Sequence, residues 1–199
     1  MLISGRAIET RSVRRRGLGA TLNWRPILLG GLFQEIGTAN VPLFTMPEAK
    51  QRMTRIDLEL WAAWWGEPLR WPASFPIRSV LAMRCALAAP QCTLDLYRAA
   101  WSEGVDVADA GALSAALTAA GHDAAAVLAA AASQPVKDAL RRNTADAIAA
   151  GACGAPTFLV RDGAGGSELV WGQDRWDTVA DELIVSRAMC EAMSHCAKE

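Results

Sequence analysis

The residues with the clearest chemical potential lie between Gly151 and Asp177, in the run GACGAPTFLVRDGAGGSELVWGQDRWD. Pro156 directly precedes a short β-prone run, and a proline at the start of a strand removes no ladder hydrogen bond. An X-Pro bond at such a position can be cis. A cis bond would turn the backbone of Ala155 outward, with its N–H and C=O free to pair with an extended peptide. The alternative is an ordinary trans proline that only begins the strand.

The residues on either side predict the elements that hold this loop. Residues 157–160 and 168–171 read as two strands joined by a Gly-rich, polar reversal. Gly172 ends the second strand, and Asp174 is placed to N-cap a helix. Apolar residues follow at helical spacing: Trp176, Val179, Ala180, Leu183 and Ile184. The run therefore predicts a β-hairpin closed by an amphipathic helix.

The earlier part of the chain predicts one strand followed by helices. Residues 20–29 alternate between apolar and polar types and are rich in β-prone residues, so they predict a strand. Thr93 and Asp123 suit helix starts, Pro135 a first helical turn and Gly151 a helix end. Helices are predicted at 32–36, 48–65, 79–89, 93–102, 107–120, 122–133 and 135–151. A helical block inserted into an α/β layer explains this order better than two domains in series.

Composition narrows the class of protein. The 199 residues carry a net charge of −1, which favours neither nucleic acid nor an anionic membrane as a partner. No apolar run reaches the roughly 18 residues of a spanning helix. Five cysteines form no C-x-x-C motif, and no secretory segment precedes them, so reduced thiols in the cytoplasm are expected. Cys190, His195 and Cys196 match no common zinc spacing, and we expect no metal.

The first 19 residues are rich in arginine and hold one acidic residue, Glu9. Such a start is compatible with an organelle presequence or a twin-arginine signal. No apolar segment follows it, so a solvated helix is the favoured interpretation.

Several motifs occur in an order and spacing that resemble a known family. They are NWRPILLGGLF (23–33), NVP (40–42), KQRMTRIDL (50–58), FPIRSVLAMR (75–84), GAPTF (154–158) and WGQDR (171–175). Together they resemble the 2-hydroxychromene-2-carboxylate isomerases and kappa-class glutathione transferases, over about residues 20–183. The resemblance implies an α/β fold: a DsbA-type thioredoxin-like sheet, from residues 1–46 and 150–199, with a large all-α insertion at 47–149.

The resemblance also implies glutathione as the ligand. The main chain of Ala155 beside Pro156 would pair with the cysteinyl unit, as an added strand would. Asp174, with Gln173 beside it, would receive the γ-glutamyl end, since a carboxylate accepts from an ammonium and a helix start favours a carboxylate. Asn40 and Lys50 match family positions near the tripeptide. Taken alone, Asp174 reads as an N-cap, Lys50 as a surface lysine and Asn40 as a turn residue.

The amino-terminal end departs from the family pattern. The family begins with a central strand and a Ser-Pro-Tyr turn, whose serine is thought to hold the glutathione thiolate. Here neither is found, and Ser4 is the nearest hydroxyl. Met53 also stands where the family tends to have tyrosine. A start placed too far downstream is the favoured explanation, against a degenerate copy or a new role for this segment.

The function implied is a glutathione-dependent isomerase of a 2-hydroxychromene-2-carboxylate-type aromatic compound. Thiolate addition to a conjugated double bond would allow rotation before glutathione leaves. Trp61, Trp64, Trp65 and Trp71 are candidates for an apolar substrate wall, although core packing is the commoner use of such residues. They suit the interface of a homodimer equally well. The alternatives are a catalytically impaired glutathione-binding protein and a kappa-like glutathione transferase.

Overall fold

The computed structural model describes residues 23–161, 166–172, 174–175 and 177–179. The helices are α3 (Leu29–Glu35), α4 (Pro42–Thr45), α5 (Glu48–Trp65), α6 (Val80–Ala88), α7 (Thr93–Arg98), α8 (Ala110–Ala119), α9 (Ala124–Ala132) and α10 (Gln134–Ala149). A 3-10 turn at Pro90–Cys92 precedes α7, and a π-helical turn at Ala99–Glu103 follows it. The strands are β1 (Thr157–Arg161) and β2 (Ser167–Trp171).

The two strands form an antiparallel hairpin, as the sequence predicts. Thr157 pairs with Trp171 and Arg161 with Ser167. Val160 and Val170 are buried together with Val179, and Phe158 packs against them. These four residues form a small apolar cluster on one face of the hairpin.

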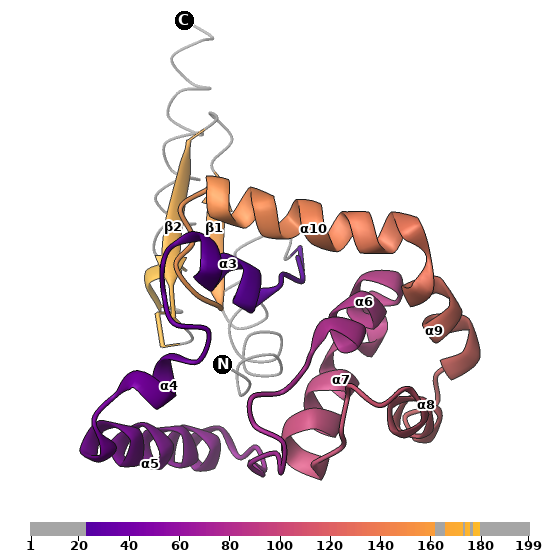
Figure 1. Ribbon diagram of the computed structural model, residues 1–199, viewed down its shortest axis with the longest axis horizontal. Coiled ribbons are helices and arrows are strands. Elements are labelled where there is room, and N and C mark those ends of the chain that lie inside the picture. The colour runs from indigo at the N-terminus through magenta and orange to yellow at the C-terminus, as the bar shows by residue number, and fades with distance from the viewer. Residues whose placement is uncertain (1–22, 162–165, 173, 176, 180–199) are drawn as a thin grey trace, which may run out of the picture.

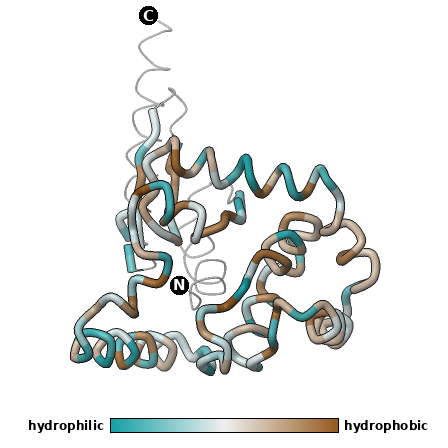
Figure 2. Tube along the Cα trace, in the orientation of Figure 1, coloured by the Kyte–Doolittle hydropathy of each residue, from teal (hydrophilic) through white to brown (hydrophobic). Residues whose placement is uncertain are grey.

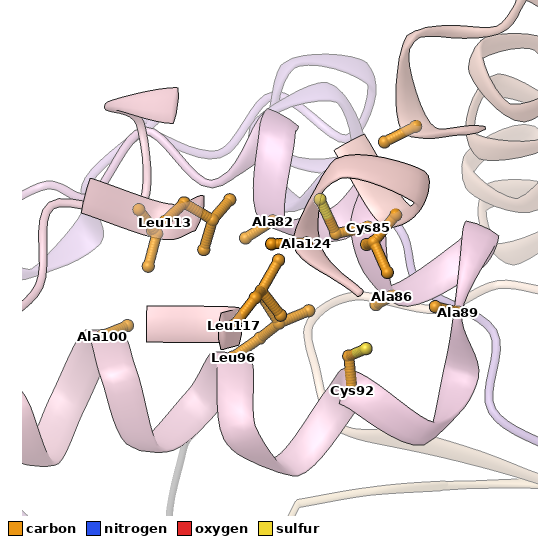
Figure 3. Close-up of a cluster of buried hydrophobic side chains, with 13 residues drawn as sticks. Ala82, Cys85, Ala86, Ala89, Cys92, Leu96, Ala100, Leu113, Leu117 and Ala124 are labelled. Atoms are coloured by element: carbon orange, nitrogen blue, oxygen red, sulfur yellow. The ribbon is translucent and has the colours of Figure 1, made fainter. Parts of the chain in front are cut away.

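The main apolar core lies apart from the hairpin, among α6 to α9 (Figures 1 and 3). It is built largely from alanine, leucine and cysteine, and Figure 2 shows α8 and α9 mostly in the tan to brown of apolar residues. Leu113 and Leu117 project from α8 toward Leu96 of α7, and Cys85 comes from α6. Alanine-rich faces let these helices approach closely.

Helix termini follow local sequence signals at several points. Asp109 and Asp123 N-cap α8 and α9, with side chains that accept from Ala112 N at 2.7 Å and Ala126 N at 3.0 Å. Gly66 ends α5 in the left-handed region, with φ of 69°. Thr93 is wrong as a cap: it is the first residue of α7, and its hydroxyl donates to Pro90 O at 2.7 Å.

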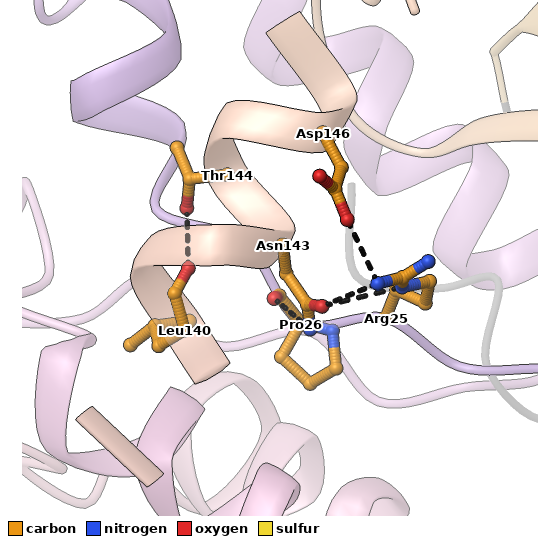
Figure 4. Close-up of polar contacts among 6 residues, drawn as sticks. All are labelled: Arg25, Pro26, Leu140, Asn143, Thr144 and Asp146. Atoms are coloured by element: carbon orange, nitrogen blue, oxygen red, sulfur yellow. Dashed lines mark hydrogen bonds and ion pairs between the residues drawn. The ribbon is translucent and has the colours of Figure 1, made fainter. Parts of the chain in front are cut away.

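The predicted strand at 20–29 is wrong over its described part. Residues 23–28 have no regular structure, and Leu29 begins α3. Their polar groups bond to side chains of α10 instead of to a neighbouring strand (Figure 4). Leu28 N donates to Thr144 Oγ1 at 3.0 Å, and Pro26 O accepts from Asn143 Nδ2 at 3.2 Å. The side chains of α10 thus supply the partners that a sheet would have given.

Along the chain, α10 connects the helical block to the hairpin. It packs on α6 and α9 within the block and on α3 at its other end (Figure 1). Gly151, with φ of 86°, follows α10 and turns the chain toward β1. The loop that carries the predicted site is therefore held between a long helix and a hairpin.

Candidate functional site

The loop before β1 is fixed by two hydrogen bonds, one on each side of Ala155. The Thr157 hydroxyl donates to Gly154 O at 2.8 Å, and Gly172 N donates to Pro156 O at 3.1 Å. The Ala155–Pro156 peptide bond is cis, so of the two isomers that the sequence leaves open the structure has the one expected of a peptide-binding loop. Ala155 is half-buried, and its N–H and C=O have no partner among the described residues. An unpaired N–H and C=O next to a strand are the groups that bind an added extended peptide.

Trp171 lies against this loop from β2. A Cβ built on Gly154 would lie 2.6 Å from Trp171 Nε1, so only glycine fits beneath the indole. Trp171 itself is 58% exposed. The sequence pattern places Trp171 in a strand but indicates no role for it in the site. Gly154, two residues before the proline, is the signal from which a close approach could have been inferred.

Asp174 stands beyond the end of β2, with its carboxylate exposed. Gly172 has φ of 121°, and a Cβ built on it would lie 2.5 Å from Asp174 Oδ1. Residues 177–179 are helical, and Val179 N donates to Arg175 O at 3.1 Å. Arg175 Nε lies 3.8 Å from Asp174 Oδ2, with both side chains largely in solvent. The acidic group therefore precedes a helical turn, and Gly172 links it to the Pro156 loop.

The other predicted residues are not all brought to this loop. Asn40 is exposed, and its Oδ1 lies 2.9 Å from the place that a Cβ on Gly30 of α3 would take. Lys50 is exposed in the first turn of α5. Neither has a hydrogen bond or ion pair to the hairpin within the described part of the chain. Ser4 and Gln173 lie outside the described residues. Ala155, Pro156 and Asp174 are thus the predicted residues that the structure gathers.

The four tryptophans proposed as a wall lie on different surfaces. Trp61 and Trp65 stack one turn apart on α5, with ring centroids 6.4 Å apart, whereas Trp64 is 74% exposed. Trp71 belongs to a separate aromatic cluster, in which its ring centroid lies 5.3 Å from that of Phe75 and 6.2 Å from that of Trp101. The guanidinium carbon of Arg55 lies over the Trp71 ring, 5.2 Å from its centroid. The helical repeat explains the division on α5, because neighbouring residues such as Trp64 and Trp65 are about 100° apart around the helix axis.

The described thiols divide into buried and exposed groups. Burial, with Cys92 nearby, raises the pKa of Cys85 to about 11, and burial next to Asp95 raises the pKa of Cys92. Both are therefore neutral thiols at physiological pH and poor nucleophiles. Cys153 is exposed, two residues before Ala155. The described residues include no group of three or more side chains that could hold a metal ion, and no described helix is long and apolar enough to cross a membrane.

Comparison with known proteins identifies the fold of this site. The sequence profile of the DSBA-like thioredoxin domain matches residues 7–184. A solved structure of selenomethionine 2-hydroxychromene-2-carboxylate isomerase is similar with a TM-score of 0.69 and 24% sequence identity. That similarity covers 99% of this chain and 91% of the other, and at this identity it shows a shared fold. No curated protein matches the chain.

Proposed function

The chain belongs to the DsbA-like thioredoxin family, and we propose that it binds glutathione and uses it to isomerise an aromatic compound of the 2-hydroxychromene-2-carboxylate type. The observation that carries the proposal is the main chain of Ala155, whose N–H and C=O have no partner among the described residues and lie next to β1. The adjacent Pro156 O accepts a hydrogen bond from Gly172 N, in the segment that leads to Asp174. The similar fold of a 2-hydroxychromene-2-carboxylate isomerase supports the choice of reaction.

Each end of glutathione has a proposed partner of suitable chemistry. The cysteinyl N–H and C=O pair with the main chain of Ala155. The ammonium of the γ-glutamyl unit lies at the exposed Asp174 carboxylate, and the helical turn after it favours the neighbouring carboxylate. Asn40 and Lys50 are proposed near the tripeptide, where a lysine suits the glycine carboxylate as a point charge.

The proposed reaction consists of a reversible addition. The glutathione sulfur forms a bond to one carbon of a conjugated double bond, and the electron pair moves into the conjugated carbonyl system. The former double bond is then single and rotates. Loss of the sulfur as thiolate restores the double bond in its other geometry, so glutathione is regenerated. No oxidant or reductant is consumed.

The test is an isomerisation assay on the purified protein with 2-hydroxychromene-2-carboxylate. We expect isomerisation above the buffer rate only when glutathione is added, and competitive inhibition by S-methylglutathione, which has no thiol to form the adduct. A rate that is unchanged by glutathione would exclude the isomerase. Glutathione binding without turnover would instead identify the protein as a catalytically impaired glutathione-binding member of the family.

A further inference from the structure

Four aromatic side chains from three separate segments meet beside α5. They come from α4, from the connector between α5 and α6, and from the π-helical turn after α7, and we call them the Trp71 cluster: Phe44, Trp71, Phe75 and Trp101. Trp71 lies edge-on to Phe75 and to Trp101. Phe75 also lies edge-on to Phe44, with ring centroids 5.8 Å apart. Edge-to-face contacts are a favoured arrangement of aromatic rings, so the rings hold one another in place.

The connector is attached to the π-helical turn by two hydrogen bonds. Arg70 N donates to Trp101 O, and the Ser102 hydroxyl donates to Pro68 O at 2.7 Å. Trp101 also packs against the main core of the helical block. π-Helical turns are rare and occur frequently at functional sites. The cluster is therefore fixed to the core at a backbone irregularity that is typical of a site.

The cluster contains a buried hydrogen-bond donor that has no acceptor. Trp71 is half-buried as a residue, but its Nε1 atom is covered and has no hydrogen-bond partner among the described residues. An unmade hydrogen bond at a buried donor is costly, and the N–H of a buried tryptophan usually finds a partner. An unsatisfied group of this kind needs an explanation, and a bound molecule with an acceptor oxygen supplies one.

A cation lies over the same ring. The guanidinium carbon of Arg55 is 5.2 Å from the centroid of the Trp71 ring. Arg55 is exposed and has no ion-pair partner within the described part of the chain. A guanidinium next to an unpaired N–H favours an anionic acceptor, and a planar carboxylate fits its parallel donors. The surrounding rings favour a flat, apolar body attached to that carboxylate.

We propose that the Trp71 cluster binds the aromatic carboxylate substrate of the reaction proposed above. The Trp71 N–H and the Arg55 guanidinium bind the carboxylate, and the rings of Phe75 and Trp101 contact the bicyclic ring. Arg55 and Phe44, which is 51% exposed, are displaced as the ligand enters. The inference rests on the proposed function for the identity of the substrate, and it adds the residues that select a carboxylate.

The first experiment measures the preference for a carboxylate by titration calorimetry without glutathione. The probes are 2-naphthoate, a flat and unreactive bicyclic carboxylate, and 2-naphthamide, its neutral counterpart of the same shape. We expect the wild-type protein to bind 2-naphthoate at least about 10-fold more tightly than 2-naphthamide, because the amide has no charge for Arg55. Equal affinity for the two probes, or no binding of 2-naphthoate at millimolar concentration, would overturn the proposal.

Matched variants test the two groups that bind the carboxylate. Trp71→Phe keeps a ring but removes the N–H, and it should weaken 2-naphthoate binding at least about fivefold. Trp24→Phe is its control, since Trp24 is also half-buried but has no ring contact with the cluster among the described residues. Arg55→Gln should reduce the carboxylate preference to about threefold or less, whereas Arg52→Gln, at an exposed arginine of the same helix, should preserve it. Equal effects of a variant and its control would show that the site is wrong.

The indole N–H itself gives a readout that does not depend on affinity. In the ¹H–¹⁵N spectrum, the signal of the Trp71 side chain is the one that Trp71→Phe removes. We expect 2-naphthoate to shift this signal and to leave that of Trp24 unchanged; an unshifted Trp71 signal at saturating 2-naphthoate would overturn the proposal.

The outcomes separate this site from the proposed reaction. A protein that passes these titrations but fails the isomerisation assay would retain the carboxylate site and lose the reaction. An active isomerase whose KM for the chromene is the same in Trp71→Phe as in Trp24→Phe would retain the reaction and lose the site.

Discussion

At the scale of single residues, the loop before β1 depends on a glycine that accommodates a large ring. Gly154 is buried under the Trp171 indole, whose outer side is in solvent. The hydrogen bond from Thr157 to Gly154 O holds the same residue from the other side. Gly154, which precedes Ala155, is therefore held by contacts that leave no room for a side chain at position 154.

Gly154→Ala should lower the free energy of unfolding by about 1–3 kcal/mol, because the new methyl group meets the indole. In a Trp171→Ala background the same change should cost less than about 0.5 kcal/mol, since the obstructing ring is gone. Urea unfolding of the four proteins gives the comparison. An equal cost in both backgrounds would show that the indole is not the constraint.

The buried thiol of Cys85 makes stability depend on alkaline pH. Its pKa is raised to about 11 in the folded protein from an ordinary value of 9.0, so the unfolded chain loses this proton first. The folded state therefore holds more protons between these values, and stability must fall as pH rises from about 9 to about 11. We expect Cys85→Ala, although less stable at pH 7, to lose less stability over that window. The measurement is urea unfolding at a series of pH values across that window; identical pH slopes would contradict the assignment.

At the scale of elements, side chains of α10 take the place of a neighbouring strand. Asn143 is buried, donates to Pro26 O at 3.2 Å and accepts from Arg25 Nη2 at 2.9 Å. Thr144 accepts from Leu28 N and donates to Leu140 O. These bonds attach residues 25–28 to the helix that leads into the site, and Figure 4 shows those of Arg25 and Pro26.

Removing the Asn143 side chain should detach this segment. Asn143→Ala leaves Pro26 O and the Arg25 guanidinium short of a partner, and we expect a loss of about 1–3 kcal/mol in the free energy of unfolding. Asp146→Ala is the control: Asp146 lies 3.0 Å from the same Arg25, but both side chains are more than half exposed. Its loss should be below about 1 kcal/mol. Equal losses in urea unfolding would contradict the account.

The elements also show what periodicity and turn residues can predict. The bounds of α5 and the pairing of β1 with β2 follow from local patterns, because a 3.6-residue repeat and a Gly-rich reversal are sequence-local signals. Residues 23–28 have the alternation of a strand, but their hydrogen-bond partners on α10 lie 116 and 117 residues away in the sequence. No local pattern indicates such partners. The site divides in the same way: the loop at Pro156 is predictable from the sequence, whereas the contact of Trp171 with Gly154 depends on the tertiary fold.

At the scale of the whole molecule, the hairpin and the alanine-rich helical block have separate apolar clusters. The chain passes from one to the other through α10, which packs on both α6 and α3 (Figure 1). In the proposed function, the hairpin side binds the tripeptide.

The most direct test of the central claim is the affinity for glutathione compared with that for cysteinylglycine, measured by titration calorimetry. If the γ-glutamyl end is bound at Asp174, glutathione should bind at least about 10-fold more tightly than the dipeptide, which corresponds to about 1.4 kcal/mol. Asp174→Asn should reduce that difference to about threefold or less, while Glu168→Gln, an exposed acid on the same hairpin, should preserve it. Equal affinity for the two peptides in the wild-type protein, or no binding of glutathione at millimolar concentration, would contradict the account.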